Sequence, residues 1–321
     1  MKGENFMRKI TMRTKTGYAI AEALENFLSK CKVKNLSQNT IEMYQIRLQV
    51  FQRFINDDTT PISSINKNTI DEYTLYLRES GTRSDVTVNS YLRDLRVFLY
   101  HCMDEGHLPT FKIKLPKVDK PIKETYTDTE LQTLLKKPNV KTCDFTEYKI
   151  WVMTNYLIAT GNRISSILNI KICDLDFDNA LIQVNKTKNR KAQIIPMSST
   201  LASVLKEFLV YRKGESSDYL FCNTYGDKGD TRTYQEMLSR YNKNRGVAKT
   251  SAHLYRHTFA KKWILNGGDI FRLQKILGHS DLSMVREYVN MFGNEISLDF
   301  NRFNPLDNMN IAHTKAKIRM S

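Results

Sequence analysis

The sequence lacks the features that define several large classes of protein. Its five cysteines are scattered, odd in number and without a C-x-x-C pair, which argues against a disulfide framework or a zinc site. This pattern is typical of a protein that resides in a reducing cytosol. No apolar run is long enough to span a bilayer, and the basic N-terminus MKGENFMRKITMRTK has no apolar core, so neither a membrane span nor a signal peptide is expected. No glycine-rich phosphate loop is present, which disfavours chemistry driven by nucleotides. These absences predict a cytoplasmic globular protein.

The positive features are length and charge. At 321 residues the chain is too long for one ordinary core and is typical of two domains. Its net charge of +15 favours a polyanionic partner. Because a basic balance also serves solubility or a membrane surface, the charge alone does not establish nucleic acid as the partner.

A proline- and lysine-rich stretch, PTFKIKLPKVDKPIKET, divides the chain at residues 109–125 and predicts an extended basic linker. Before it, and after a basic tail at 1–17, the apolar spacing and capping residues predict a bundle of four helices at 18–30, 37–56, 68–80 and 85–106. In the second of these we expect Ile46 on the apolar face and Arg47 on the outer face.

After the linker, the pattern predicts a helical domain that carries a small sheet. Thr127 and Glu130 form a capping-box pattern, and an apolar helix ends at Gly161. A further helix is expected over 163–176. Two β-rich runs, ALIQVN and AQIIPM, flank the polar turn KTKNRK and predict a β-hairpin.

One helix concentrates donors for an anion. In AHLYRHTFA, His253 and Arg256 are three residues apart, so both side chains reach the same object, and the basic run NKNRGVAK precedes them. Convergent histidine and arginine donors favour a phosphate. The alternative from these residues alone is a core helix with a satisfied histidine and an arginine whose charged end reaches solvent.

Five fragments in order carry a resemblance to a known family. TGNR before a helix, TKNRK in a hairpin that ends in IIPM, HLYRHTFA, ILGHSDLS and EYV resemble the tyrosine recombinase (phage integrase) family. The resemblance implies a mainly α fold, with a helical SAM-like core-binding domain at 18–108 and a mostly α catalytic domain with a small antiparallel sheet at 126–293. It also implies a terminal helix and tail at 294–321. Members of the family cut and rejoin DNA strands through a 3′-phosphotyrosine, with no metal, ATP or other cofactor.

The resemblance also implies a catalytic set: Arg163, Lys188, His253, Arg256, His279 and Tyr288. The two arginines suit the negative charge that builds on the phosphate, and Tyr288 would be the nucleophile. His253 would accept the proton of the tyrosine or hydrogen-bond the phosphate, and His279 would donate a further hydrogen bond to the phosphate. Lys188 in the turn, preferred over Lys186 by its register from Pro196, would protonate the leaving 5′-hydroxyl. The neighbouring His257 is interpreted as structural. Ser166 stands where the family usually has a glutamate, and Met284 and Val285 where small hydroxyl residues are common.

The expected partner is double-stranded DNA with paired inverted-repeat core sites. Only about 17 residues precede the first helix, which is too few for a further domain binding separate arm sites. We expect a free monomer and a homotetramer in the synaptic complex, with the segment from about 294 exchanged between protomers. Candidate DNA contacts are Asn39, Arg47, Asn89, Arg93, Arg96, Lys117, Lys120 and Lys123.

Three other functions compete with recombination. The first is an accessory DNA-binding protein of the same fold without catalysis, which an intact set of catalytic positions disfavours. The second is a type IB topoisomerase, which the small size and the core-binding bundle disfavour. The third is a helical RNA-binding protein, for which no stacking-aromatic platform is visible.

Overall fold

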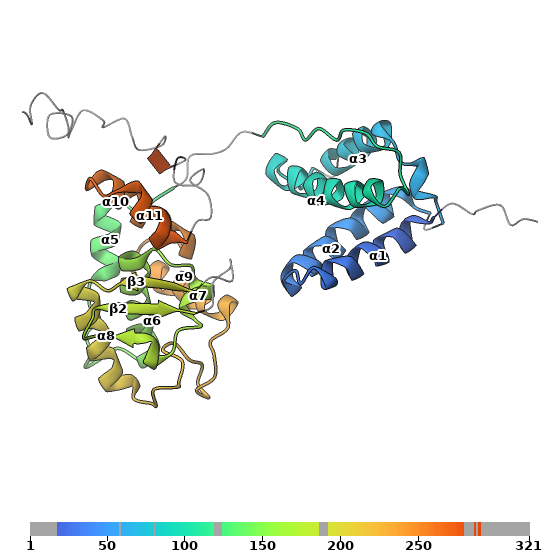
Figure 1. Ribbon diagram of the computed structural model, residues 1–321. Helices are drawn as coiled ribbons and strands as arrows, with labels where there is room; N and C mark the ends of the chain where they lie inside the picture. Colours follow the sequence, from blue (N-terminus) through green and yellow to red (C-terminus); the bar gives the residue numbers. More distant parts are fainter. Residues whose placement is uncertain are drawn as a thin grey trace, which may run out of the picture. The chain divides into compact units, whose positions relative to one another are not determined.

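The computed structural model describes residues 18–57, 59–79, 81–118, 124–185, 192–278, 286 and 288–289. The chain divides into two compact units, Met1–Pro121 and Ile122–Ser321 (Figure 1). None of the helices within the described ranges is both long and apolar enough to cross a bilayer.

The N-terminal unit is a bundle of four helices around one apolar core. Its elements are α1 (Ile20–Val33), α2 (Gln38–Ile55), the short 3-10 turn η1 (Ile62–Ser64), α3 (Lys67–Glu79) and α4 (Asp85–Asp104). The hydroxyls of Ser37 and Ser84 cap α2 and α4 by accepting from the backbone N–H groups of Thr40 and Thr87. Four helices at the expected places confirm the predicted helical bundle.

The prediction that Ile46 of α2 faces the core and Arg47 faces solvent was wrong for both residues. Ile46 is 53% exposed, whereas Arg47 is half-buried and forms an ion pair with Asp94 of α4 at 2.6 Å. The cause is a tertiary partner 47 positions away, which helical spacing within α2 does not reveal.

The first half of the proline- and lysine-rich stretch packs on the N-terminal unit. Ile113 is buried in that core, and its backbone N–H donates to the Tyr100 hydroxyl at 3.3 Å. The side-chain amide of Asn89 donates to the carbonyl of Pro116 at 2.8 Å. The described residues of this half form neither helix nor strand, and they pack on the bundle through Ile113 and Pro116.

The C-terminal unit surrounds a central helix with helices and a small sheet. Its elements are α5 (Asp128–Leu135), α6 (Phe145–Thr160), α7 (Ile164–Ile167), η2 (Ile172–Asp174), β1 (Leu175–Asp176), β2 (Leu181–Val184), β3 (Gln193–Pro196), α8 (Ser199–Arg212), α9 (Thr231–Asn244), α10 (Ala252–Leu265) and α11 (Ile270–Leu277). The apolar helix α6 packs against α5, α8, α9 and α10, which explains why it is apolar on all sides.

The sheet is antiparallel with the order β1-β2-β3, and Ile182 of β2 lies opposite Ile195 of β3. The hairpin prediction is confirmed, and β1 is an additional strand. The helix expected over 163–176 ends at Ile167, because the following residues pair with another segment. The backbone N–H of Leu220 donates to the carbonyl of Ile170 at 2.8 Å, and the chain then enters η2 and β1.

A buried polar network fastens the start of the C-terminal unit to two later helices. The side-chain amide of Asn242 on α9 donates to the Tyr126 hydroxyl at 2.9 Å, and its carbonyl oxygen accepts from the Tyr255 hydroxyl on α10 at 3.0 Å. The backbone N–H of Tyr126 donates to the Thr258 hydroxyl, also on α10, at 2.9 Å. Residue 126 is therefore held directly against the helix that carries His253 and Arg256.

Candidate active site

Helix α10 presents its two expected functional residues at different depths. The hydroxyl of Ser251 caps the helix by accepting from the backbone N–H of His253 at 3.3 Å. His253 in the first turn is exposed, whereas Arg256 one turn later is 4% exposed. The capped N-terminus thus places an imidazole at the surface above a buried guanidinium.

Two helix C-termini hold the Arg256 guanidinium. Its Nη1 donates to the carbonyl of Gly161 at 2.9 Å, and its Nη2 donates to the carbonyl of Leu277 at 2.7 Å. These carbonyls end α6 and α11, where the partial negative charge of a helix favours a cation. Both helices close with a left-handed glycine, Gly161 (φ 64°) and Gly278 (φ 62°). A Cβ on Gly161 would lie 2.5 Å from the Phe259 ring, so this turn requires glycine.

Arg163, Arg256 and Tyr288 share one electrostatic environment. Burial, together with the charge of Arg163, lowers the pKa of Arg256 to about 10, and Tyr288 opposes the shift. Burial also lowers the pKa of the half-buried Arg163, again with Tyr288 opposing. The structure therefore brings together three of the residues expected from sequence, from the start of α7, from α10 and from the segment beyond α11.

Tyr288 is enclosed and has an unexpected partner. It is 1% exposed and packs with Ala260, Leu273 and Leu277 in a small apolar cluster. Its hydroxyl lies 2.6 Å from Nδ1 of His257. The sequence interpretation of His257 as structural missed this contact, because 31 residues separate the pair and no local pattern connects them.

Lys188 and His279 lie outside the described residues, as does the alternative Lys186, but the strands beside the turn are described. Strand β3 begins at Gln193, whose side-chain amide donates to the carbonyl of Ile276 at 2.7 Å and also to that of Lys275. The base of the hairpin is thereby tied to the last turn of α11, directly before residue 279. Ser166, at the position of the family's usual glutamate, is buried, and its backbone N–H donates to the carbonyl of Arg163 at 2.9 Å.

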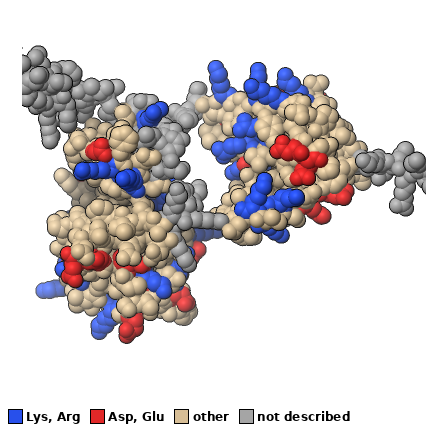
Figure 2. Space-filling model, viewed as in Figure 1, with Lys and Arg blue, Asp and Glu red and all other residues tan. Residues whose placement is uncertain are grey.

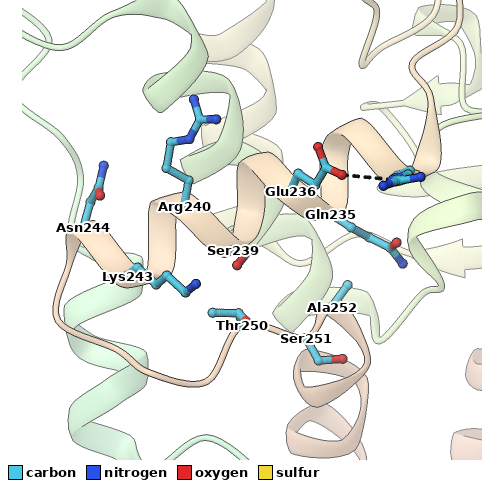
Figure 3. Close-up of a pocket in the computed structure, with 10 residues that line it drawn as sticks. Gln235, Glu236, Ser239, Arg240, Lys243, Asn244, Thr250, Ser251 and Ala252 are labelled. Carbon is cyan, nitrogen blue, oxygen red and sulfur yellow. Dashed lines mark hydrogen bonds and ion pairs between the residues drawn. The ribbon is translucent and has the colours of Figure 1, made fainter.

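A polar groove of about 680 Å³ lies between α9 and the N-terminus of α10 (Figure 3). We call it the α9 groove; its lining includes Arg232, Gln235, Glu236, Ser239, Arg240, Lys243, Asn244, Thr250 and Ser251. Arg232 pairs with Glu236 at 3.0 Å. The basic run before His253 is visible in the sequence, but no binding role was predicted for the exposed face of α9. The charged residues of that face are separated by helical turns, so they do not form a continuous run in the sequence.

The candidate DNA contacts of the N-terminal unit and linker differ in exposure and in intramolecular partners. Asn39, Arg93 and Lys117 are exposed, and Arg96 is half-buried. Arg47 and Asn89 make the intramolecular contacts described above, with Asp94 and Pro116. Lys120 and Lys123 lie outside the described residues. Figure 2 shows lysine and arginine side chains spread over the visible face of both units, interspersed with acidic ones.

Comparison with known proteins gives matches over both units. The profile of the Phage integrase family matches residues 124–295, and that of the Phage integrase SAM-like domain matches residues 18–118. The tyrosine recombinase XerC of Leptospira interrogans is 28% identical over 294 residues, covering 89% of this chain and 94% of the relative. The tyrosine recombinase XerD of Listeria innocua is 27% identical over 284 residues, covering 85% and 94%.

Among solved structures, the fold is similar to the Tn1549 transposon integrase in complex with transposon right end DNA. The TM-score is 0.72 at 20% identity, over 89% of this chain and 99% of the other. A dimer of lambda integrase bound to a core site gives a TM-score of 0.66 at 16% identity, over 83% and 97%. At these identities the likeness concerns the fold.

Proposed function

The chain belongs to the phage integrase family, and from this premise we propose how its residues perform the reaction of a tyrosine-type site-specific DNA recombinase. Such an enzyme cleaves a DNA strand by forming a 3′-phosphotyrosine and rejoins strands by the reverse step. The observation that carries the assignment of residues is the meeting of Tyr288 with Arg163 and Arg256, described above. A nucleophile within the electrostatic reach of two guanidinium groups suits phosphoryl transfer to a tyrosine.

The arginines bind and activate the scissile phosphate. Guanidinium groups offer paired donors that stay charged at any working pH, and they stabilise the charge that develops on the non-bridging oxygens. The carbonyls of Gly161 and Leu277 fix the orientation of Arg256 before DNA arrives, so little reorganisation is needed in the transition state. His253 and His279 would donate further hydrogen bonds to the phosphate, and Lys188 would protonate the leaving 5′-oxygen.

The α9 groove supports DNA binding next to this site. Arg240 and Lys243 offer positive charge to the DNA backbone, and Gln235 and Asn244 offer groups for hydrogen bonds. The groove reaches Ser251 and Ala252 at the start of α10, one residue from His253. DNA held there would place a phosphate near the N-terminus of α10. The Tn1549 integrase, whose fold is similar, was solved with transposon DNA.

The proposed substrate is a pair of inverted-repeat core sites on double-stranded DNA. A monomer would bind each half-site and two sites would assemble a homotetramer, with the segment from about 294, which lies outside the described residues, passed between protomers. The dimer of lambda integrase on a core site supports assembly of more than one protomer on DNA. The proposed location is the cytoplasm, with the DNA of the nucleoid.

The test is trapping of the covalent intermediate. A nicked site releases a short strand after cleavage and prevents rejoining, so the wild-type protein should accumulate a protein–DNA adduct that survives denaturation. Tyr288→Phe should abolish the adduct without weakening DNA binding. Tyr225→Phe is the matched control, because Tyr225 is 89% exposed and lies on a turn outside the site.

The same assay, together with assays of plasmid relaxation and of recombination between two sites, separates the alternatives. A protein that binds DNA but forms no adduct on any nicked site would be an accessory protein of this fold. Relaxation of supercoiled plasmid without exchange between two sites would identify a topoisomerase. An adduct that persists in Tyr288→Phe would show that the nucleophile is another residue.

A further inference from the structure

We propose that His257 is a catalytic residue that accepts the proton of Tyr288 during strand cleavage. This proposal rests on the proposed function, since it assigns a partner to the nucleophile of that reaction. The observation is the distance of 2.6 Å between Nδ1 of His257 and the hydroxyl oxygen of Tyr288. A proton acceptor must lie within hydrogen-bond reach of the proton that it removes, and this contact meets that requirement.

Burial strengthens the assignment. Tyr288 is 1% exposed and His257 is half-buried, so the phenol is shielded from bulk water. An ordinary phenol has a pKa of about 10 and stays protonated at neutral pH. The field of Arg163 and Arg256 favours the phenolate, but the proton still needs an acceptor, and His257 lies at hydrogen-bond distance from the hydroxyl.

From its position in the motif, His253 is expected either to accept the proton of the tyrosine or to hydrogen-bond the phosphate. The structure distinguishes the two histidines by depth. His253 is exposed in the first turn of α10, where it suits a contact with DNA phosphate, and His257 lies one turn deeper against the nucleophile. The two histidines therefore have different roles: His253 donates to the phosphate, and His257 accepts the hydroxyl proton of Tyr288.

The charges of the site give this proton transfer a dependence on DNA. Arg163 and Arg256 both interact electrostatically with Tyr288, so a third positive charge beside this tyrosine is disfavoured by repulsion in the free protein. A bound phosphate supplies negative charge and offsets this repulsion. A bound scissile phosphate therefore makes transfer of the proton to His257 more favourable than it is in the free protein.

The step balances in protons and electrons. As the tyrosine oxygen forms its bond to phosphorus, the hydroxyl proton passes to Nδ1 of His257. The bond from phosphorus to the 5′-oxygen breaks, and that oxygen leaves with the electron pair and takes a proton from the general acid, assigned above to Lys188. In rejoining, the 5′-hydroxyl attacks, its proton returns to the general acid, and the departing tyrosine oxygen recovers the proton from His257. No co-reactant is consumed.

The test uses the full-length chain and the nicked substrate. In His257→Asn the amide stands near the position of Nδ1 and can hydrogen-bond Tyr288, but it cannot carry the proton. We expect DNA binding to be unchanged and adduct formation to slow by about 100- to 10,000-fold, which is the usual contribution of a general base. His257→Gln, the second variant, should show the same loss.

Rescue separates proton acceptance from positioning. A fluorinated tyrosine at position 288, whose phenol ionises near neutral pH, needs no base. It should restore His257→Asn and His257→Gln to within about tenfold of the wild-type protein carrying the same fluorinated residue. It should not restore Arg163→Ala, because that variant lacks a phosphate donor rather than a proton acceptor.

Two results would overturn the proposal. One is adduct formation by His257→Asn at the wild-type rate, and the other is a loss in both variants that the fluorinated tyrosine does not repair, which would mean that His257 only positions Tyr288. Absence of any adduct from the wild-type protein would instead refute the proposed function, so the two failures are distinguishable.

Discussion

Replacing Arg256 by methionine should slow cleavage strongly without unfolding the protein. Methionine keeps most of the apolar length of the arginine, so packing in this nearly buried position is preserved. What the variant loses is the charge and the two bonds to the carbonyls of Gly161 and Leu277. Both losses have estimable consequences.

The charge itself destabilises the fold. Burial lowers the pKa of Arg256 to about 10, and at 1.36 kcal/mol per pKa unit a shift of this size corresponds to about 3 kcal/mol. Because the folded pKa lies below the unfolded value for a base, the destabilisation is fully present below about pH 10 and is lost as the pH rises through that value. Removing the charge relieves this cost throughout the working range of pH.

The lost hydrogen bonds act in the opposite direction. Each buried carbonyl left without a donor costs about 1–3 kcal/mol. The two contributions are of similar size, so the free energy of unfolding of Arg256→Met should stay within about 3 kcal/mol of the wild-type value. Cleavage should fall by at least about 100- to 1,000-fold, as for the removal of one donor to a developing oxyanion.

The assay combines denaturant unfolding with adduct formation on the nicked site. Arg212→Met on α8 is the matched control. Arg212 has a side chain only 8% exposed, pairs with Asp218 and donates to the carbonyls of Lys213 and Tyr219. None of these three partners is a site residue. The control should cleave normally. Cleavage by Arg256→Met at the wild-type rate, or unfolding severe enough to explain its loss, would refute the reasoning.

Four further outcomes are expected. Gly161→Ala should destabilise the protein by about 1–3 kcal/mol and slow cleavage, because φ is +64° and the new Cβ would displace the Phe259 ring; normal unfolding and cleavage would count against the role of this turn. Lys188→Ala should slow cleavage of an ordinary site but much less that of a 5′-phosphorothiolate, whose sulfur leaves without a proton; equal losses on both would remove Lys188 from the role. The affinity for a core site should fall steeply as salt rises in a filter-binding titration, and a flat response would contradict multiple phosphate contacts. Truncation after Gly293 should spare binding to one half-site but prevent tetramer assembly on gels, and normal recombination by the truncated protein would exclude a role of the tail in trans.

Local chemistry made most helix boundaries predictable from sequence. Ser37 and the Thr127–Glu130 capping box start helices, and Gly161 ends one, as expected. These signals depend on residues within four positions of each other, so no tertiary information is needed. The two-residue strand β1 is too short to leave a periodic pattern and was not predicted.

The features that sequence did not reveal depend on partners far along the chain. Arg47 turns inward because Asp94 is available on α4, and His257 gains a role because Tyr288 packs against it. The arginines of the site were found through the family resemblance and not through helical spacing. The resemblance identifies matching positions but does not identify contacts such as that of His257.

The buried network around Tyr126 determines where this chain can be cut and joined to another. Asn89 holds the carbonyl of Pro116 on one side of the boundary, and Asn242 with Thr258 holds Tyr126 on the other. A chimera that exchanges N-terminal units should therefore be joined between Pro116 and Tyr126. A donor segment that replaced Tyr126 by a residue without a hydroxyl would remove one partner of the Asn242 amide and loosen α10 from outside the catalytic residues. Hybrid recombinases joined after residue 126 would then lose activity for a structural reason, although every catalytic side chain was retained.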